Sequence, residues 1–224
     1  GALAYEAKSR AVADTEAARW IEATNRYLTH QLAQLSDTPT PAVVAMRAGS
    51  LGVELLLDEP CAVVDGFVLD PTSATAWRLD PALELAGIEA AGGGEQPYSP
   101  ALVPVGRTAG GDLHLDLEQV GLIAVDGEPD TVHGWMRTIA TAIAVVPNAR
   151  PCEVVALGLD TEMSGLVNVT IPSDPAAWVE QFCHEMRQLN ARLDATPYRQ
   201  RVQPGEVFHP TIVLLGADQA GVGR

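Results

Sequence analysis

The chain has 224 residues, of which 47% are hydrophobic, so it is long and apolar enough to bury a core as one large domain or two small ones. Its 29 acidic residues outnumber its 14 lysines and arginines, and the resulting formal charge of −15 repels nucleic-acid phosphates and anionic lipid headgroups. Its longest basic cluster, Arg192 to Arg201, is interrupted by Asp194, so we expect no direct nucleic-acid binding and no membrane contact by this chain itself.

The first elements expected are one long helix and a β-hairpin. Apolar residues recur at helical spacing from Trp20 onward and predict a helix from about Asp14 to Leu35. Two prolines in the next six residues end it. Two short β-rich runs, joined by a glycine-containing turn, then predict a hairpin. These runs are Val43–Arg47 and Val53–Leu57, and the turn is Gly49-Ser50-Leu51-Gly52.

A boundary is expected in the stretch from Ala86 to Pro100. This stretch contains Gly92-Gly93-Gly94 and two prolines, a composition that favours an exposed connection over a packed element. We therefore predict a helix plus β-hairpin subdomain over residues 1–95 and an α/β sheet subdomain over residues 96–224.

The remainder of the chain alternates apolar β-rich runs with amphipathic helices. Such alternation is typical of parallel strands in a sheet covered on both faces. The predicted fold class is therefore α/β, with a mixed, largely parallel sheet flanked by helices, resembling a degenerate P-loop NTPase. The expected strands are Leu102–Val105, Leu113–Leu117, Leu122–Val125, Val154–Leu159, Val167–Ile171 and Thr211–Leu215, and the expected helices are Asp130–Val145 and Pro175–Asp194.

The segment from Leu122 to Asp130 resembles a phosphate site, because a strand, a glycine turn and a helix N-terminus bind phosphates in α/β proteins. A working loop needs G-x-x-x-x-G-K-[ST], and counting from Gly127 places Val132, His133 and Gly134 where glycine, lysine and hydroxyl belong. Acidic residues at 126, 128 and 130 would repel a triphosphate. Gly127 and His133 are therefore the weak candidates for a nucleotide site, and hydrolysis is not expected.

Metal and hydrolase patterns are incomplete. His184-Glu185 begins like the zinc-protease pattern H-E-x-x-H, but Gln188 occupies the position of the second histidine. Glu180 lies one turn before His184, and the only further ligand nearby, Cys183, points elsewhere around the helix. No G-x-S-x-G follows a strand, so we predict no catalytic residue, no metal site and no cofactor.

The three cysteines form no C-x-x-C pair and cannot all pair with one another, which favours reduced thiols in a cytoplasmic setting. They are Cys61, Cys152 and Cys183.

Several apolar and glycine-containing patterns carry a resemblance to a known family. They lie within 43–47, 52–60, 100–107, 115–118, 127–129, 154–158 and 209–215. Together they resemble the region after the transmembrane helices in large actinobacterial membrane proteins that carry a LysM module and often a bacterial transcriptional activator domain. The resemblance implies a cytoplasmic segment of a membrane-tethered protein and brings no catalytic residues. More distantly, residues 102–105, 116–118 and the strands at 122 and 154 are similar to FtsK-type and type VII secretion ATPases, with a degenerate phosphate loop.

Three hypotheses of function follow. The first is a non-catalytic scaffold, sensory or protein-interaction domain, favoured because every enzyme motif is incomplete. The second is a nucleotide-binding domain of degenerate ATPase type. The third is a small-ligand enzyme that uses scattered acids such as Asp58, Glu59, Asp126 and Asp130. Protein partners or self-association are expected, and the apolar stripe with Trp20 and Tyr27 suggests a dimer.

Overall fold

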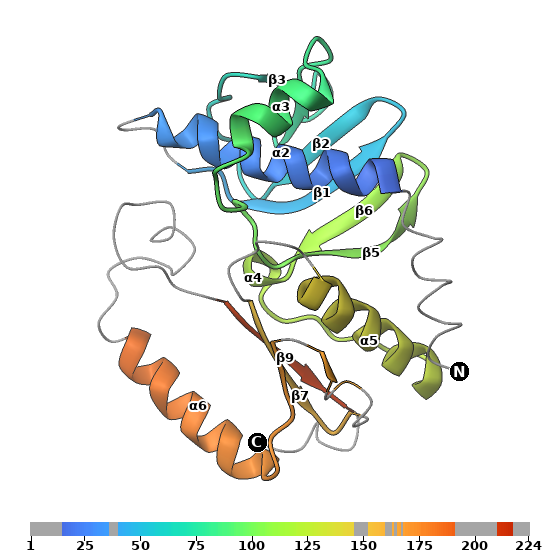
Figure 1. The fold of residues 1–224 in the computed structure, drawn as a ribbon, viewed down its shortest axis with the longest axis vertical. Coiled ribbons are helices and arrows are strands. Elements are labelled where there is room, and N and C mark those ends of the chain that lie inside the picture. The colour runs from blue at the N-terminus through green and yellow to red at the C-terminus, as the bar shows by residue number, and fades with distance from the viewer. Residues whose placement is uncertain are drawn as a thin grey trace. The chain divides into compact units, whose positions relative to one another are not determined.

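The computed structural model describes residues 15–35, 40–145, 152–159, 163, 165–166, 168–190 and 210–216. Contacts within the chain divide it into two compact units, between Leu122 and Ile123 (Figure 1). This division lies beyond the boundary predicted after residue 95, because the two strands that follow residue 95 pair into the sheet of the first unit. Each unit is described by itself.

The first unit is built on a six-stranded sheet in the order β3-β4-β2-β1-β6-β5, in which every pairing is antiparallel. The β1–β2 hairpin confirms the prediction, since the turn joins Gly49 to Gly52. The elements are α2 (Thr15–Ala33), β1 (Val43–Gly49), β2 (Gly52–Leu57), β3 (Phe67–Leu69), β4 (Ala76–Leu79), α3 (Leu85–Gly92), β5 (Leu102–Thr108), β6 (Gly111–Asp116) and α4 (Leu117–Val120).

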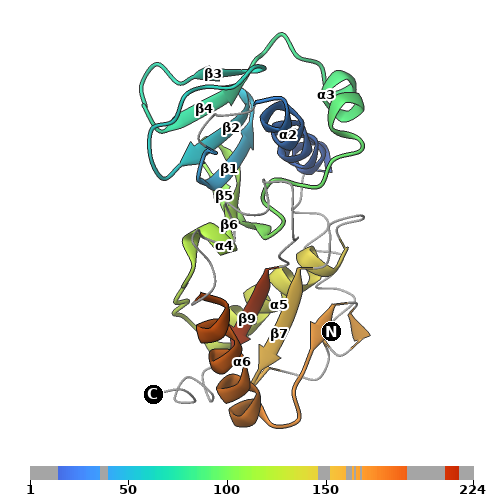
Figure 2. The same cartoon turned by 90° about the vertical axis from the view of Figure 1, so that its left-hand side faces the viewer.

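Helix α2 lies across one face of this sheet with α3 beside it (Figures 1 and 2). The predicted helix is thus confirmed, although Asp14 lies outside the described residues. Alternate residues of β2 are buried, as expected for a strand with one face on a core. The largest fully buried side chains of this unit include Trp77, Leu28, Met46 and Leu55, each 0% exposed.

The stretch predicted as an exposed connection is instead packed. Its first part forms α3, where Ile88 is 1% exposed, and Tyr98 beyond the helix is 6% exposed. Gly92 permits the packing, because a Cβ there would lie 2.8 Å from the backbone nitrogen of Tyr27. Gly92 therefore serves a close approach of two helices, which the sequence interpretation missed.

A side-chain amide ties α2 to the chain that follows α3. Asn25 donates through Nδ2 to the carbonyl oxygen of Ser99 at 2.9 Å, and Asn25 Oδ1 accepts from the Ser99 backbone nitrogen at 2.8 Å. Both residues are buried, so each hydrogen bond replaces one that water would otherwise make.

The second unit holds a three-stranded parallel sheet in the order β8-β7-β9. Here the parallel pairing of three predicted strands and the presence of both predicted helices are confirmed, although Val167 and Asp194, at the bounds of these elements, lie outside the described residues. The elements are α5 (Pro129–Val145), β7 (Glu153–Leu157), β8 (Val169–Thr170), α6 (Pro175–Asn190) and β9 (Thr211–Leu215).

The prediction of a mixed, largely parallel, P-loop-like sheet is wrong. The main sheet is antiparallel, and residues 122–125 form no strand. The apolar runs at Leu102 and Leu113 are strands, but their connection is far shorter than the roughly twelve residues or more that a parallel crossover requires. They therefore form a hairpin, and β6 then pairs with β1.

Candidate functional site

The nucleotide candidates Gly127 and His133 lie before and within the start of α5, without a paired strand ahead of them. Gly127 has a positive φ of 155° and is exposed, and His133 is half-buried in the second turn of α5. No paired strand leads into this turn, so the strand-turn-helix arrangement that would place a phosphate at the helix N-terminus is missing.

The other residues weighed from the sequence also remain apart. On α6, His184 Nε2 lies 2.8 Å from Gln188 Nε2, within hydrogen-bond distance. The described residues hold no group of three or more potential metal ligands. Ser50 sits exposed in the β1–β2 turn. The structure gives none of the three cysteines a disulfide bond: Cys152 is buried, Cys183 is exposed, and burial raises the pKa of Cys61.

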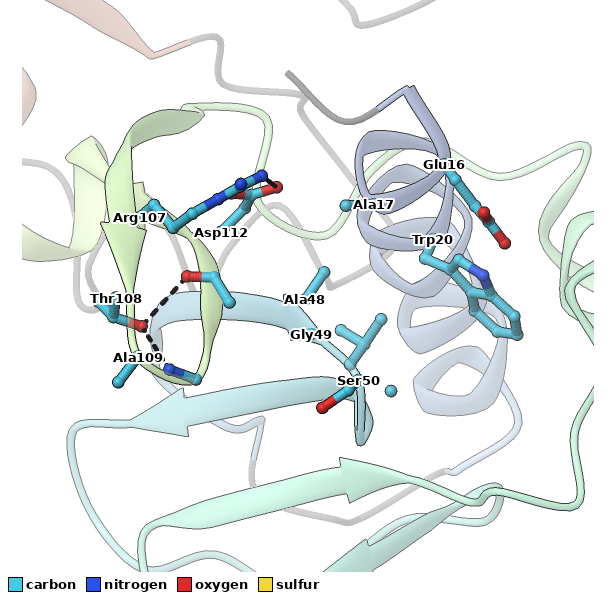
Figure 3. A pocket seen from close by; sticks show the side chains of 14 residues that line it. Glu16, Ala17, Trp20, Ala48, Gly49, Ser50, Arg107, Thr108, Ala109 and Asp112 are labelled. Carbon is cyan, nitrogen blue, oxygen red and sulfur yellow. Dashed lines mark hydrogen bonds and ion pairs between the residues drawn. The ribbon is translucent and has the colours of Figure 1, made fainter. Parts of the chain in front are cut away.

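The described surface of the first unit is hollowed where α2 meets the tips of two hairpins, β1–β2 and β5–β6 (Figure 3). The cavity has a volume of about 530 Å³. We call it the tip hollow. Its lining comes from three segments and consists of Glu16, Ala17 and Trp20 of α2, of Ala48, Gly49, Ser50, Gly52 and Val53, and of Arg107, Thr108, Ala109, Gly110, Gly111 and Asp112.

Glycines bring the two tips together at the floor of the tip hollow. A Cβ on Gly49 would collide with the carbonyl oxygen of Gly110, and one on Gly111 would collide with the carbonyl oxygen of Ala48. Gly111 also has φ +131°, which L side chains rarely adopt. The tips are thus held by backbone-to-backbone contact that no larger residue allows.

One ion pair spans the β5–β6 tip. Arg107 Nε lies 2.6 Å from Asp112 Oδ1, and Arg107 Nη2 lies 3.1 Å from Asp112 Oδ2, so the contact is bidentate. The hydrogen bonds from Arg107 lower the pKa of Asp112 despite its burial. The two side chains differ in exposure, at 63% for Arg107 and 15% for Asp112. The arginine is therefore the accessible partner, and the aspartate is the fixed, ionised one.

Helix α2 supplies the facing wall. Trp20 is half-buried and Glu16, one turn earlier, is exposed, while Arg107 extends from β5 toward the helix (Figure 3). The tip hollow thus combines an indole face, two carboxylates and one guanidinium that already has a carboxylate partner. Such a set suits polar ligands, and the hydrogen bonds described for its lining join no nucleophile to a base.

A buried histidine lies two residues beyond Asp112 on the same face of β6. His114 pairs with Met46 of β1, and burial lowers its pKa to about 4, although the charge of Asp112 opposes that shift. Its Nδ1 is buried and has no hydrogen-bond partner within the described residues. The imidazole is therefore held neutral.

The opposite face of the sheet carries a second set of charges, which we call the charge ladder. Glu54 on β2 stands directly opposite Arg47 on β1 and Arg78 on β4, and it forms ion pairs with both. Arg78 also pairs with Asp70. The pKa of Asp70 is lowered chiefly by hydrogen bonds from the Thr72 hydroxyl and backbone nitrogen, with Arg78 adding to the effect.

Every arginine in the described part of the first unit has a carboxylate partner. Besides the charge ladder and the Arg107 pair, Arg19 Nη2 lies 2.7 Å from Glu89 Oε1, and Arg26 Nη2 lies 3.4 Å from Glu22 Oε1. The same residues contain fourteen acidic side chains, five arginines and no lysine. The first unit therefore presents a surplus of carboxylates, with its arginines already engaged.

Comparison with protein families, with curated proteins and with solved structures gives no match to this chain. Among the described residues, no helix has both the length and the apolar character needed to cross a bilayer.

The sequence interpretation missed the Arg107–Asp112 pair and the tip hollow. The signal was present in Arg107-Thr108-Ala109-Gly110-Gly111-Asp112, a glycine-containing link between two β-rich runs, which is typical of a hairpin. Opposite charges at its two ends are typical of a cross-strand ion pair. The position of α2 over this tip had no comparable signal.

Proposed function

We propose that this chain is a non-catalytic scaffold, sensory or protein-interaction domain, and that the tip hollow is its contact site. The observation that supports the proposal is the chemistry of the lining. Arg107 and Asp112 neutralise each other, and the lowered pKa of Asp112 makes it a weak base at neutral pH. A recess with Trp20 on one wall and polar groups on another suits recognition of a partner.

We also propose a cellular context, in which this chain is a domain of a larger membrane-tethered protein. The resemblance to membrane-tethered actinobacterial proteins supports a cytoplasmic domain of a larger chain. The scattered acids do not favour an enzyme: Asp58 and Glu59 are exposed, and neither lines the tip hollow. The apolar stripe that suggested dimerisation is used within the unit, because Tyr27 is 6% exposed and its ring centroid lies 6.0 Å from that of Phe67.

Photo-crosslinking in the native cell tests the proposal. A benzophenone amino acid replaces Ala109, which is exposed at the β5–β6 tip, in the full-length protein. The matched control replaces Ala74, which is also exposed and lies in the β3–β4 connection. The carbonyl oxygen of the next residue, Thr75, accepts a hydrogen bond from Leu57 at the end of β2 away from the tips. We expect a discrete protein adduct from position 109 only. Equal adducts from both positions, or none from 109, would overturn the proposed site.

A further inference from the structure

We propose that the tip hollow recognises a cationic side chain, an arginine or lysine of a protein partner, which replaces Arg107 at Asp112. This inference rests on the proposed function and specifies the chemistry of the partner. It starts from the asymmetry of the ion pair, whose carboxylate is mostly covered while its guanidinium is mostly exposed.

Replacing Arg107 by another cation at Asp112 should cost little free energy. An ion pair whose cation is exposed contributes little net free energy, because water and side-chain entropy compensate for the contact. Asp112 lies near the start of β6 and is fixed by strand pairing, opposite Ala48 of β1 and Arg107 of β5. Arg107, whose side chain is mostly exposed, is therefore the partner that an incoming cation displaces, whereas Asp112 stays in place and still requires a positive partner.

The rest of the lining also favours a cation. Trp20 offers an aromatic face for the aliphatic stem or the charged group of an arginine or lysine. Glu16 adds a second carboxylate at the same recess. An anionic ligand would meet these two carboxylates and gain only a guanidinium that Asp112 already holds.

The charge of the surrounding surface also favours a cationic ligand. The described part of the first unit has fourteen acidic residues and five arginines, each arginine with a carboxylate partner, so its field attracts basic segments. A basic protein segment is thus the occupant that both the local lining and the overall charge support.

The test is an NMR titration of the whole 224-residue chain with N-acetyl-arginine methylamide. Its neutral isostere, the citrulline amide, and the corresponding glutamate amide serve as comparison probes. We expect the arginine probe to shift the Trp20 indole NH and the amides of Gly49, Gly110 and Gly111, and the other two probes to leave them unchanged. Shifts of equal size with citrulline, or larger shifts with glutamate, would overturn the inference.

Two variants with the same charge change sharpen this test. Arg107→Gln removes the competing guanidinium and is expected to tighten binding of the arginine probe by up to about fivefold, the factor that an exposed ion pair represents. Arg19→Gln changes the net charge equally, but Arg19 pairs with Glu89 and does not line the tip hollow, so it should leave the affinity nearly unchanged. Equal tightening by both would show attraction to acidic surface alone and overturn the inference.

Asp112→Asn is expected to weaken binding of the arginine probe on the order of tenfold, since a charge-assisted contact is lost. If that variant loses its folded spectrum, the Arg107→Gln and Arg19→Gln pair still decides the outcome.

The experiments distinguish a failure of the inferred cation recognition from a failure of the proposed contact site. Crosslinks from Ala109 without arginine binding leave a contact site of another chemistry, whereas arginine binding without crosslinks leaves a cation site with no partner in the cell.

Discussion

The Arg107 pair and the charge ladder lie on opposite faces of one antiparallel sheet and use the same residue types differently. In the ladder, the Glu54 side chain is 13% exposed and contacts two arginines from neighbouring strands. Asp70 forms an ion pair with one of them, Arg78. At the tip, one mostly exposed arginine meets one aspartate beside a cavity. Several shared partners make the ladder a structural network, whereas the high exposure of Arg107 makes the tip pair exchangeable.

The largest loss of stability is expected from a substitution at the β5–β6 tip. Gly111→Ala adds a Cβ against the Ala48 carbonyl oxygen and forces an L residue into a positive φ, so it should lower the free energy of unfolding by about 4 kcal/mol. Urea unfolding followed by NMR signals of first-unit residues measures this loss. Gly94→Ala is the control, because a Cβ there meets nothing within 4 Å. A near-neutral Gly111→Ala would mean that the tips do not touch as described.

The sequence predicted elements whose pattern is local and missed the arrangement that distant residues impose. The Gly49 to Gly52 turn, α2, α5, α6, β7 and β9 follow from periodicity, caps and glycine chemistry. Two further strands, at Phe67 and Ala76, are too short to give a clear periodic signal. Leu122 to Val125 had the apolar composition of a strand but finds no pairing partner among the described residues. Composition alone does not supply the neighbouring strand that a sheet requires.

The candidate site was harder to predict for the same reason. The Arg107–Asp112 pair follows from hairpin register, which is a local property, once the short link is interpreted as a turn. The contact of Gly49 with Gly110 and the placement of Trp20 depend on β1 pairing with β6, more than 60 positions along the chain. Only the assembled sheet brings these residues together.

Acid is expected to weaken the sheet between the two charge sites through His114. The folded pKa of His114 is about 4, below the usual value of 6.5, so in this interval the unfolded chain binds a proton that the folded unit excludes. Stability from this residue is complete above pH 6.5 and falls by about 2–3 kcal/mol as the pH drops to 4. His114→Gln should flatten this slope in urea unfolding of the first unit. An unchanged slope in His114→Gln would show that the imidazole titrates normally.

The ladder should respond more strongly than an ordinary surface pair when its central acid is neutralised. Glu54→Gln keeps the shape and removes the charge between Arg47 and Arg78, so the free energy of unfolding should fall by about 1–2 kcal/mol. Glu89→Gln, in the exposed pair with Arg19, is the matched control and should cost less than about 0.5 kcal/mol. Equal losses in the two variants would remove the distinction between network and isolated pair.

The smallest effect is expected at Arg107, and its smallness supports the exchange of cations. Arg107→Gln should change the free energy of unfolding by less than about 0.5 kcal/mol, because the guanidinium is 63% exposed and water replaces its contacts. The same variant should shift the pKa of Asp112 upward, since the hydrogen bonds from Arg107 are what lower it. Carbon-detected NMR titration of the Asp112 carboxylate measures this shift, with Asp70 as the reference carboxylate in the same spectrum. A loss as large as that of Glu54→Gln would mean that Arg107 is a structural residue and does not leave Asp112 for a partner. A small loss with a raised Asp112 pKa would show that the carboxylate depends on a cation that the fold itself hardly needs.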